Sequence, residues 1–325
     1  MEAIKVLLSR HLPDEVEKAF TDNFDVTLNQ SDIPLTEAQW IDAFASFDVI
    51  CPCVIDQLGK NLLQKIDKPR TRLLANFGVG YNHIDIATAR VKGIAVTNTP
   101  DVLTDATADL AMTLLLMLAR RAGEGERQLR AGAWTGWYPT HLMGSMASGK
   151  TLGIIGMGRI GLAMATRASK GFGMDILYHN RRPIPKESLG KIKAEYFQNL
   201  EEMLPQCDFL SLHCPGGEST RHILNAASLS KLPQHAFVIN TSRGDVIDEP
   251  ALIQALQEKT IAGAGLDVYS REPVIPPEFL TMENVVLLPH LGSATRETRI
   301  AMGMRVLNNV KAFLAGKNPP DLVTP

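Results

Sequence analysis

The chain has 325 residues, of which 45% are hydrophobic and 21% are charged, a balance typical of folded globular proteins rather than disordered chains. This length suits two domains with sizeable cores. The formal net charge of −2 gives no excess that would favour nucleic acid or an anionic membrane, and we expect neither as a partner.

The cysteines and the N-terminal segment favour a reducing compartment. Cys51 and Cys53 are one residue apart, which is not the spacing of a zinc knuckle or a thioredoxin motif, and Cys207 and Cys214 flank a strand-like segment. We therefore expect reduced, buried thiols and no metal site. The first residues lack a signal-peptide pattern, and the apolar run 110–119 is too short to span a bilayer. We predict a cytoplasmic protein.

Short apolar and β-branched segments alternate with helical segments along the whole chain. Most of the apolar segments are continuous, as expected where helices cover both faces of a parallel sheet. The alternation predicts an α/β fold with right-handed crossovers. The expected strands are residues 4–8, 49–53, 73–76, 95–98, 151–155, 175–178, 209–213, 237–240, 262–267 and 285–288.

Two long helical segments suggest how the domains are divided. They span residues 102–121 and 295–315, and we expect them to form the hinge. The simplest partition inserts a nucleotide-binding domain, residues 100–290, into an outer domain made of residues 1–99 plus 291–325. The stretch 123–148, which contains glycines and two tryptophans, is interpreted as an arm or loop.

The strongest local signal is a glycine loop, GMGRIG at 156–161, which follows an apolar strand and leads into an alanine-rich helix. The first glycine, Gly156, allows a tight turn and the second, Gly158, lets the backbone approach a pyrophosphate. The third, Gly161, lets helix and strand pack closely. The helix N-terminus, with Arg159 and Ile160, supplies amide donors and the positive end of the helix dipole. The loop predicts a dinucleotide site.

The end of the next expected strand indicates which dinucleotide is bound. NAD enzymes usually carry an acidic residue near Asn180 that accepts the ribose hydroxyls, and here that carboxylate is absent. Arg181 and Arg182 follow instead, and they would attract a 2′-phosphate. The sequence favours NADP(H), with NAD(H) as the alternative cofactor; a solvated pair of arginines without a ligand is the other interpretation.

Three polar residues follow three downstream strands, at the edge of the sheet where ligands bind in open α/β folds. Arg243 can bind a carboxylate and polarise a keto oxygen. His290 can donate a proton, and Glu272 can orient the imidazole and stabilise its charged form. Each alone has a common structural explanation, but together they predict reduction of a 2-keto acid, with a nicotinamide supplying the hydride.

These motifs together resemble the D-isomer-specific 2-hydroxyacid dehydrogenase family over nearly the whole chain. The resemblance implies two Rossmann-like, doubly wound parallel-sheet domains, the outer one flavodoxin-like, with the active site in the interdomain cleft of a homodimer. It assigns Arg243, Glu272 and His290 as the catalytic residues. The motifs that carry it are NFGVGYNHID (76–85), GMGRIG (156–161), NTSRG (240–244), LDVY (266–269) with Glu272-Pro273, and PHLGSA (289–294).

The resemblance also implies ligand contacts. In the family, the loop matching Val79 and Gly80 binds the substrate carboxylate through backbone amides, and Thr107 matches a position that touches the cofactor phosphates. Ordinary helix polarity is the alternative for Thr107 and for Asp109. The expected cofactor contacts near the adenosine and nicotinamide ends further comprise Cys214, Pro215, Thr241, Asp267, His290 and Gly292.

The segment GAWTGWYP (132–139) resembles the glyoxylate/hydroxypyruvate reductase branch, in which a tryptophan matching Trp137 reaches the partner subunit's active site. Simple packing of a dimer arm is the alternative for Trp137. We therefore expect NADPH-dependent reduction of glyoxylate and hydroxypyruvate.

Other relatives remain alternatives. Formate dehydrogenases usually carry Gln at the position of Glu272 and fit poorly, whereas a phosphite dehydrogenase is not excluded by fold. Phosphoglycerate dehydrogenases often carry an additional regulatory domain, which we do not expect here. A corepressor that senses the cofactor without turnover is the alternative from another class.

Overall fold

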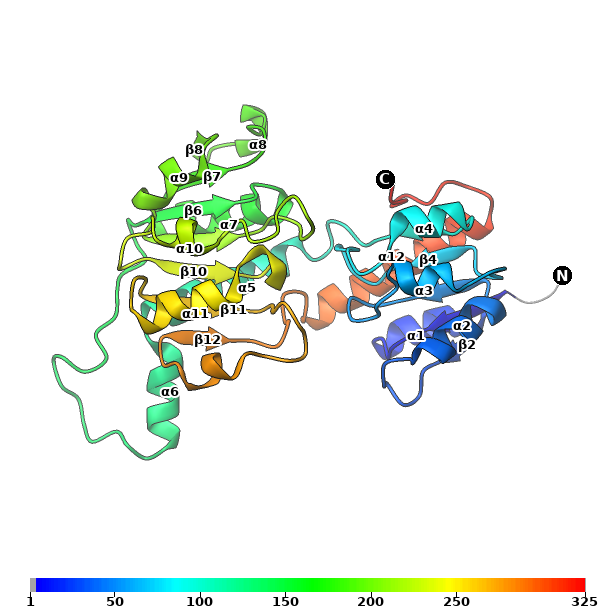
Figure 1. Cartoon of the computed structure of the whole chain (residues 1–325), viewed down its shortest axis with the longest axis horizontal. Coiled ribbons are helices and arrows are strands. Elements are labelled where there is room, and N and C mark those ends of the chain that lie inside the picture. Colours follow the sequence, from blue (N-terminus) through cyan, green and yellow to red (C-terminus); the bar gives the residue numbers. More distant parts are fainter. Residues whose placement is uncertain (1–3, 325) are drawn as a thin grey trace. The chain divides into compact units, whose positions relative to one another are not determined.

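In the computed structural model, residues 4–324 are described, and they form two compact α/β units (Figure 1). The first unit runs to Leu103 and resumes at Ser293, and the second comprises Thr104–Gly292. Both sheets are parallel throughout, which confirms the predicted class of two doubly wound domains. The boundaries expected from the sequence, 99/100 and 290/291, lie a few residues from these divisions.

The first unit has a five-stranded sheet with the order β2-β1-β3-β4-β5, which is the flavodoxin-like arrangement. Its central strands are continuous apolar runs with buried side chains, as expected of a sheet covered on both faces. The strands are β1 (Lys5–Leu8), β2 (Asp25–Leu28), β3 (Val49–Cys51), β4 (Leu73–Ala75) and β5 (Ala95–Thr97), and the helices are α1 (Asp14–Thr21), α2 (Glu37–Ser46), α3 (Lys60–Gln64), α4 (Ile86–Val91) and α12 (Arg296–Leu314).

The last helix, α12, belongs to the first unit although it follows the second in sequence. Thr295 caps its N-terminus by accepting a hydrogen bond from the Thr298 amide, and the helix stops at Ala315, before Gly316 in the left-handed region. It packs on α1, where a Cβ at Gly303 would lie only 2.4 Å from Val16. The C-terminal segment therefore completes the core of the first unit.

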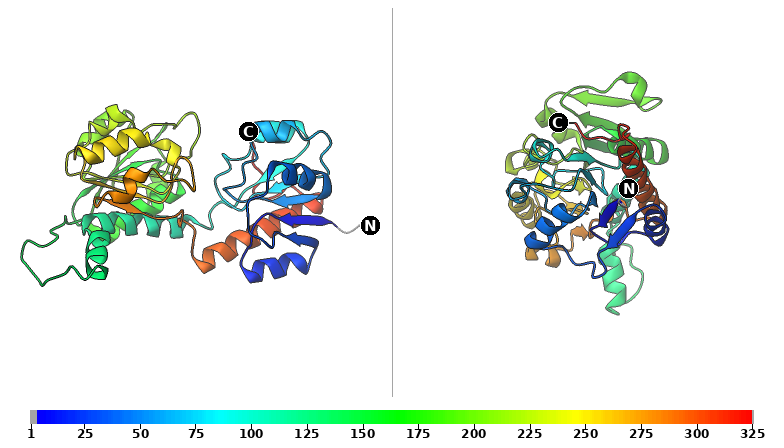
Figure 2. Two further views of the ribbon diagram at one scale, coloured as in Figure 1. Left: turned by 60° about the horizontal axis from the view of Figure 1, so that its bottom comes forward. Right: turned by 90° about the vertical axis from the view of Figure 1, so that its right-hand side faces the viewer.

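The second unit has a seven-stranded sheet with the order β12-β11-β10-β9-β6-β7-β8, the dinucleotide-binding arrangement with one further strand. One face is covered by α5 and α7 and the other by α10 and α11 (Figure 2). The strands are β6 (Thr151–Ile155), β7 (Asp175–His179), β8 (Ala194–Phe197), β9 (Phe209–Leu212), β10 (Phe237–Asn240), β11 (Gly263–Leu266) and β12 (Val285–Leu287), and the helices are α5 (Thr104–Ala119), α6 (Ala122–Arg130), α7 (Arg159–Phe172), α8 (Lys186–Leu189), α9 (Leu200–Met203), α10 (Ala226–Leu229) and α11 (Glu249–Gln257), with short 3₁₀ turns at Leu204–Gln206, Gly244–Val246 and Pro277–Thr281.

The segment interpreted as an arm, residues 123–148, is partly helical. Its first part lies in α6, and the remainder is an irregular loop that extends away from the sheet of the second unit (Figures 1 and 2). The loop returns to the end of α5, where the Ser145 amide donates to the Ala119 carbonyl over 2.7 Å. Gly144 is required there, since a Cβ would lie 2.1 Å from the same oxygen.

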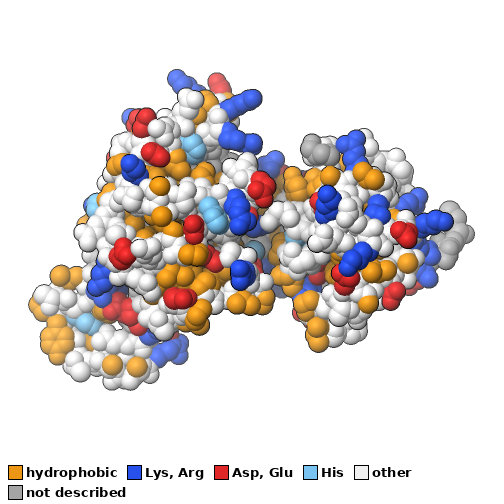
Figure 3. Space-filling view, viewed as in Figure 1, with side chains coloured by type: hydrophobic (Ala, Val, Ile, Leu, Met, Phe, Trp, Pro, Cys, Tyr) orange, Lys and Arg blue, Asp and Glu red, His pale blue; other side chains and the backbone are white. Residues whose placement is uncertain are grey.

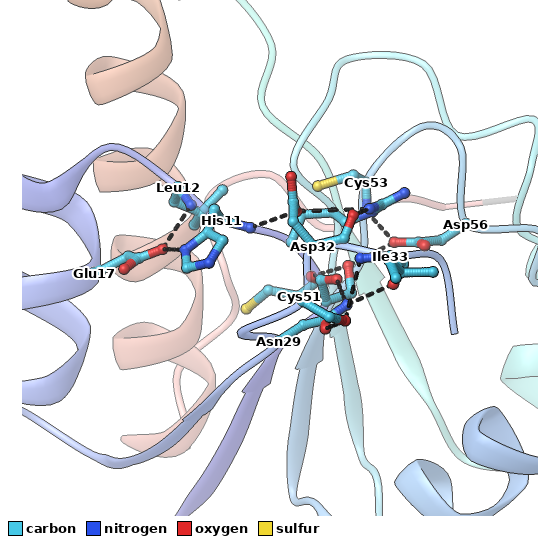
Figure 4. Close-up of polar contacts among 12 residues, drawn as sticks. His11, Leu12, Glu17, Asn29, Asp32, Ile33, Cys51, Cys53 and Asp56 are labelled. Atoms are coloured by element: carbon cyan, nitrogen blue, oxygen red, sulfur yellow. Dashed lines mark hydrogen bonds and ion pairs between the residues drawn. The ribbon is translucent and has the colours of Figure 1, made fainter. Parts of the chain in front are cut away.

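All four cysteines are free thiols, and Figure 4 shows the Cys51 and Cys53 side chains pointing in different directions. Cys51, Cys207 and Cys214 are buried as expected, whereas Cys53 is half-buried. Desolvation raises the pKa of Cys53 to about 12, which keeps its thiol protonated at neutral pH. Within residues 4–324, no group of three His, Cys, Asp or Glu side chains is arranged to hold a metal ion. No helix in that range is sufficiently long and apolar to cross a membrane.

Candidate functional site

The glycine loop lies where the strand order of the second sheet reverses, between β6 and β9. Gly156 has φ +96°, and a Cβ there would lie 2.5 Å from the nitrogen of Cys214. Gly161 faces β6, with a Cβ position 2.3 Å from the Gly156 carbonyl oxygen. A Cβ at Gly158, in contrast, would meet no atom of the described chain within 4 Å. Gly156 and Gly161 thus permit close packing of protein atoms, whereas Gly158 leaves open space at the start of α7.

The N-terminus of α7 is suited to an anion. Gly158 is its N-cap, and a glycine has no side chain that could accept hydrogen bonds from the first amides of the helix. Arg159 is exposed at the first helical position and Ile160 is half-buried beside it. A pyrophosphate would satisfy both the amides and the helix dipole.

Asn180 follows β7 and is bound to the glycine loop. Its Oδ1 accepts a hydrogen bond from the Met157 amide over 2.7 Å, and its carbonyl accepts one from the Tyr196 hydroxyl. The remaining polar group of its side chain is a donor, the Nδ2 amide. Arg181 and Arg182 are exposed directly after it. Figure 3 shows that Lys and Arg side chains gather over this β7–β8 segment, so the local charge is positive.

His290 and Glu272 form a direct pair after β12 and β11. The His290 Nδ1 lies 2.7 Å from Glu272 Oε2, and Glu272 Oε1 accepts a hydrogen bond from the Tyr269 amide over 3.0 Å. Burial would raise the pKa of Glu272, but the hydrogen bond and charge of His290, the Tyr269 amide and the charge of Arg243 together lower it. The carboxylate is therefore ionised at neutral pH and holds the imidazole by its Nδ1 atom.

Arg243 follows β10 in a loop fixed by Asn240. The Asn240 Nδ2 donates to the Arg243 carbonyl over 2.8 Å, while its Oδ1 accepts from the amide and hydroxyl of Ser242. Burial lowers the pKa of the Arg243 guanidinium, and the charges of Glu272 and Asp245 oppose that effect. The structure thus brings Arg243, Glu272 and His290 into one electrostatic cluster at the edge of the second sheet.

Asp267 holds the loop that carries His290. Its two carboxylate oxygens accept hydrogen bonds from the amides of Leu291, at 2.6 Å, and Gly292, at 2.8 Å. Thr107, on α5, donates from its hydroxyl to the Gly292 carbonyl over 3.1 Å. Burial raises the pKa of Asp267, although these amides and the charge of His290 act in the opposite direction. Asp267 and Thr107, which the sequence predicts near the cofactor, thus fix the loop that carries His290.

Thr241 and Cys214 lie in the neighbouring loops after β10 and β9. The Thr241 hydroxyl is buried and has no hydrogen-bond partner in the described protein. Such a group is costly unless a ligand or water satisfies it. Cys214 is buried against the glycine loop, and the following Pro215 is exposed. These positions leave an unsatisfied hydroxyl and an exposed loop on the same edge as the glycine loop.

In the first unit, the turn at Gly78, Val79 and Gly80 follows β4. Asn76 Nδ2 donates to the carbonyls of Gly78 and Gly80, and Asn98 Nδ2 donates to that of Val79. The amides of Val79 and Gly80 have no acceptor among the described residues. Unpaired amides in a turn form a nest that suits a carboxylate.

Trp137 lies in the loop after α6 and is 80% exposed. Trp134 and Tyr138 beside it are also exposed. The side chain contributes nothing to the core of the second unit, so packing within that core does not explain it.

Sequence reasoning did not assign the asparagines that fix these loops, Asn240, Asn76 and Asn98. Asn240 is the last residue of β10, and Asn76 and Asn98 directly follow β4 and β5. Each precedes a glycine-containing or proline-containing turn, which is a usable signal. Asparagine offers two donors and an acceptor, and it is the side chain that can hold several backbone groups of a turn at once.

Comparisons with known proteins cover nearly the whole chain. A family model described as "D-isomer specific 2-hydroxyacid dehydrogenase, NAD binding domain" matches residues 112–292. Glyoxylate reductase of Thermococcus litoralis is 43% identical over 323 residues, with 98% of this chain and 96% of the relative covered. Glyoxylate reductase of Pyrococcus horikoshii is 41% identical, with 98% and 95% covered. The structure of an NADPH-dependent glyoxylate/hydroxypyruvate reductase from Sinorhizobium meliloti, in complex with NADP and malonate, has a TM-score of 0.87 and 36% identity, with 99% and 97% covered.

Proposed function

The chain belongs to the D-isomer-specific 2-hydroxyacid dehydrogenase family, and we propose that it reduces small 2-keto acids, glyoxylate to glycolate and hydroxypyruvate to D-glycerate, with NADPH as the preferred cofactor. The observation that carries the proposal is the joint placement of Arg243, Glu272 and His290 at the sheet edge that also holds the glycine loop. The names of the relatives support glyoxylate as substrate.

The residues of the second unit fit a nicotinamide dinucleotide. The open space at Gly158 and the uncapped start of α7 suit a pyrophosphate, and the orphaned Thr241 hydroxyl suits a polar group of the ligand. When bound, the reduced cofactor supplies the hydride. The chain's own residues then have to bind the acid, polarise its carbonyl and provide a proton.

The proposed roles follow from charge and geometry. Arg243 binds the substrate carboxylate and polarises the keto oxygen, because a buried guanidinium interacts strongly with an anion. His290 donates the proton to the developing alkoxide, and Glu272 stabilises the imidazolium and holds it by Nδ1, which leaves Nε2 for the substrate. The amides of Val79 and Gly80 provide further donors for the carboxylate.

The preference for NADPH rests on the end of β7. The Asn180 acceptor is already used by the Met157 amide, so its side chain offers a donor rather than an acceptor for ribose hydroxyls. A 2′-phosphate accepts such a donor, and Arg181 and Arg182 add positive charge beside it. The NADP-bound relative from Sinorhizobium meliloti is consistent with this cofactor.

Assembly and location remain predictions. We propose a homodimer in which the exposed Trp137 of one subunit contributes to the active site of the other, and we retain the expectation of a cytoplasmic protein. A large exposed aromatic ring on an extended loop is more readily explained by a partner surface than by solvent.

The direct test is initial-rate oxidation of NADPH and of NADH with glyoxylate, hydroxypyruvate and pyruvate in parallel. We expect the highest kcat/KM with NADPH and the two smaller acids. Activity mainly with NADH would retain the reaction and refute the role of the arginines. Cofactor binding without turnover of any acid would refute reduction of these acids and favour the sensor alternative.

A further inference from the structure

We propose that Asn76 and His83, together with Asn98, are positioning residues that hold the amides of Val79 and Gly80 in place for an incoming carboxylate. The inference rests on the proposed function, because it deepens the role given there to these two amides. Asn76 and His83 lie in the NFGVGYNHID segment, in which only the turn itself was given a role from the sequence.

Asn76 directly follows β4 and is completely buried. Its Nδ2 atom donates to the carbonyl oxygens of Gly78, at 3.0 Å, and Gly80, at 3.1 Å. Both amide hydrogens of this side chain are therefore used within one turn. The Gly78 carbonyl belongs to the same planar peptide group as the Val79 N–H, so holding this oxygen directs the Val79 N–H the other way. The Gly80 N–H shares its peptide group with the Val79 carbonyl, which Asn98 holds.

His83 fixes the orientation of that amide. Its Nε2 atom lies 3.0 Å from Asn76 Oδ1, and the ring is buried. Because Nδ2 must face the two carbonyls, Oδ1 must face the ring, so Nε2 carries a hydrogen and donates it. If the Asn76 amide were flipped, its oxygen would face the Gly78 and Gly80 carbonyl oxygens and its NH₂ group would face the N–H of the His83 ring. The hydrogen bond from His83 therefore opposes this flip.

The third carbonyl of the turn is held separately, since Asn98 Nδ2 donates to the Val79 oxygen over 2.8 Å. Gly78 also packs closely, since a Cβ there would lie 3.0 Å from Val54 Cγ1 and 3.4 Å from Asn76 Nδ2. The turn is thus held on its carbonyl side and by packing, while the amides of Val79 and Gly80 have no acceptor in the described chain. Donors fixed before the ligand arrives bind it without the cost of ordering the loop.

Three variants separate this role from a merely structural one. Asn76→Asp keeps the shape but replaces the two donors with an oxygen that repels both carbonyls. His83→Phe removes the ring donor, whereas His83→Gln can return an N–H at similar reach. Asn23→Asp, on the surface of the same unit, makes the same charge change where Asn23 only donates to the Ala19 carbonyl.

The test uses the NADP-loaded protein and oxalate, a non-reducible dianion, as the probe in calorimetric titration, together with glyoxylate kinetics. For Asn76→Asp and His83→Phe we expect Kd for oxalate and KM for glyoxylate to rise roughly tenfold or more, with KM for NADPH changed less than about twofold. His83→Gln is expected to recover most of the loss and Asn23→Asp to match the wild type.

Other outcomes overturn the inference. Unchanged oxalate affinity in Asn76→Asp or in His83→Phe would show that the amides need no such support, and the second variant decides if the first does not fold. An equal rise of KM for both substrates would indicate general destabilisation instead. Oxalate binding to a wild type that does not reduce glyoxylate would refute the proposed reaction but leave the nest, whereas no oxalate binding would refute the nest itself.

Discussion

The imidazole of His290 meets the carboxylate of Glu272 through Nδ1 and Oε2, 2.7 Å apart, although the two residues are separated by 18 positions in sequence. The other carboxylate oxygen, Oε1, accepts a hydrogen bond from the Tyr269 amide. His290 has φ +55°, a conformation that is uncommon for a residue other than glycine, and its own amide is bound to the Asp267 carbonyl. The hydrogen bond to Asp267 and the pairing with Glu272 thus hold His290 in a left-handed backbone conformation.

Glu272→Gln tests the pair. Glutamine preserves the acceptor for the Tyr269 amide but removes the charge that stabilises the imidazolium, so kcat/KM for reduction is expected to fall roughly 10- to 100-fold at neutral pH. Because the pKa of Glu272 is lowered, activity of the wild type should fall only in acid, as this carboxylate is protonated, and the variant should lack that fall. The measurement is the pH profile of kcat/KM. An unaltered profile would show that the carboxylate only supports the loop.

Arg243→Ala is expected to lower kcat/KM for glyoxylate roughly 100- to 1,000-fold, since the variant loses both the anion contact and the polarising charge. Arg243→Lys should recover little, because an ammonium group cannot make the planar two-point contact. Fluorescence titration with NADPH is the control and should remain close to wild type. Retained turnover would exclude Arg243 from the reaction.

The glycine loop gives a paired prediction. Gly156→Ala places a methyl group 2.5 Å from the Cys214 nitrogen at a φ of +96°, so we expect a loss of roughly 2–4 kcal/mol in the free energy of unfolding. Gly158→Ala meets no described protein atom and should unfold like the wild type while binding NADPH roughly tenfold or more weakly. Denaturant unfolding and cofactor titration measure the two effects. Equal cofactor affinity in Gly158→Ala would show that no phosphate approaches this position.

Replacing both Arg181 and Arg182 by Ala should raise KM for NADPH roughly 10- to 100-fold and leave KM for NADH within about threefold. The matched control is Lys186→Ala with Lys191→Ala, which removes the same charge from the same exposed segment. If the control pair has an equal effect, the preference comes from the general positive field and not from contacts with the 2′-phosphate.

Asp48 predicts a pH-dependent stability. Its carboxylate accepts hydrogen bonds from Arg70 Nε and Nη2, at 3.0 and 3.1 Å, and from the Lys5 amide at 2.9 Å. Burial opposes ionisation, but these bonds outweigh it and lower the pKa of Asp48. A lowered pKa in the folded state stabilises the protein above the ordinary aspartate range, and this contribution is lost as the pH falls through the lowered value.

Asp48→Asn should therefore lower the free energy of unfolding by about 1–3 kcal/mol at neutral pH, and the difference from wild type should shrink in acid. Asp22→Asn, which breaks an exposed pair with Lys18, is the control and should cost less than about 1 kcal/mol. A difference for Asp48→Asn that is independent of pH would contradict the assignment.

Much of the fold could be predicted because the central strands are continuous buried apolar runs. The two strands that were not predicted, β2 and β8, lie at sheet edges, and their side chains are mostly exposed or half-buried. An edge strand needs only one neighbour and little burial, so its sequence carries a weak signal. The helix α6 was not expected either, because its AGEGERQLR sequence contains two glycines and buries none of its residues.

The site was predictable to the extent that its residues follow strands. Arg243, Glu272 and His290 could be placed at one edge by that rule alone, but their pairing could not, since it depends on the path of each loop. The support from Asn76 and His83 was not visible, because it requires knowing which backbone groups a turn directs inward. Asp267 was expected near the cofactor, and the structure additionally shows it holding the Leu291 and Gly292 amides.

The hydrogen bond from Thr107 to the Gly292 carbonyl joins the first turns of the inserted segment to its last residue. When the two ends of a domain lie close together, the domain can be inserted into a loop of another domain without separating the parts of the host. Residues 104–292 therefore have the form of an inserted domain with neighbouring ends. In the first unit, Leu103 is followed by Ser293, so α12 continues the fold that the inserted domain interrupts.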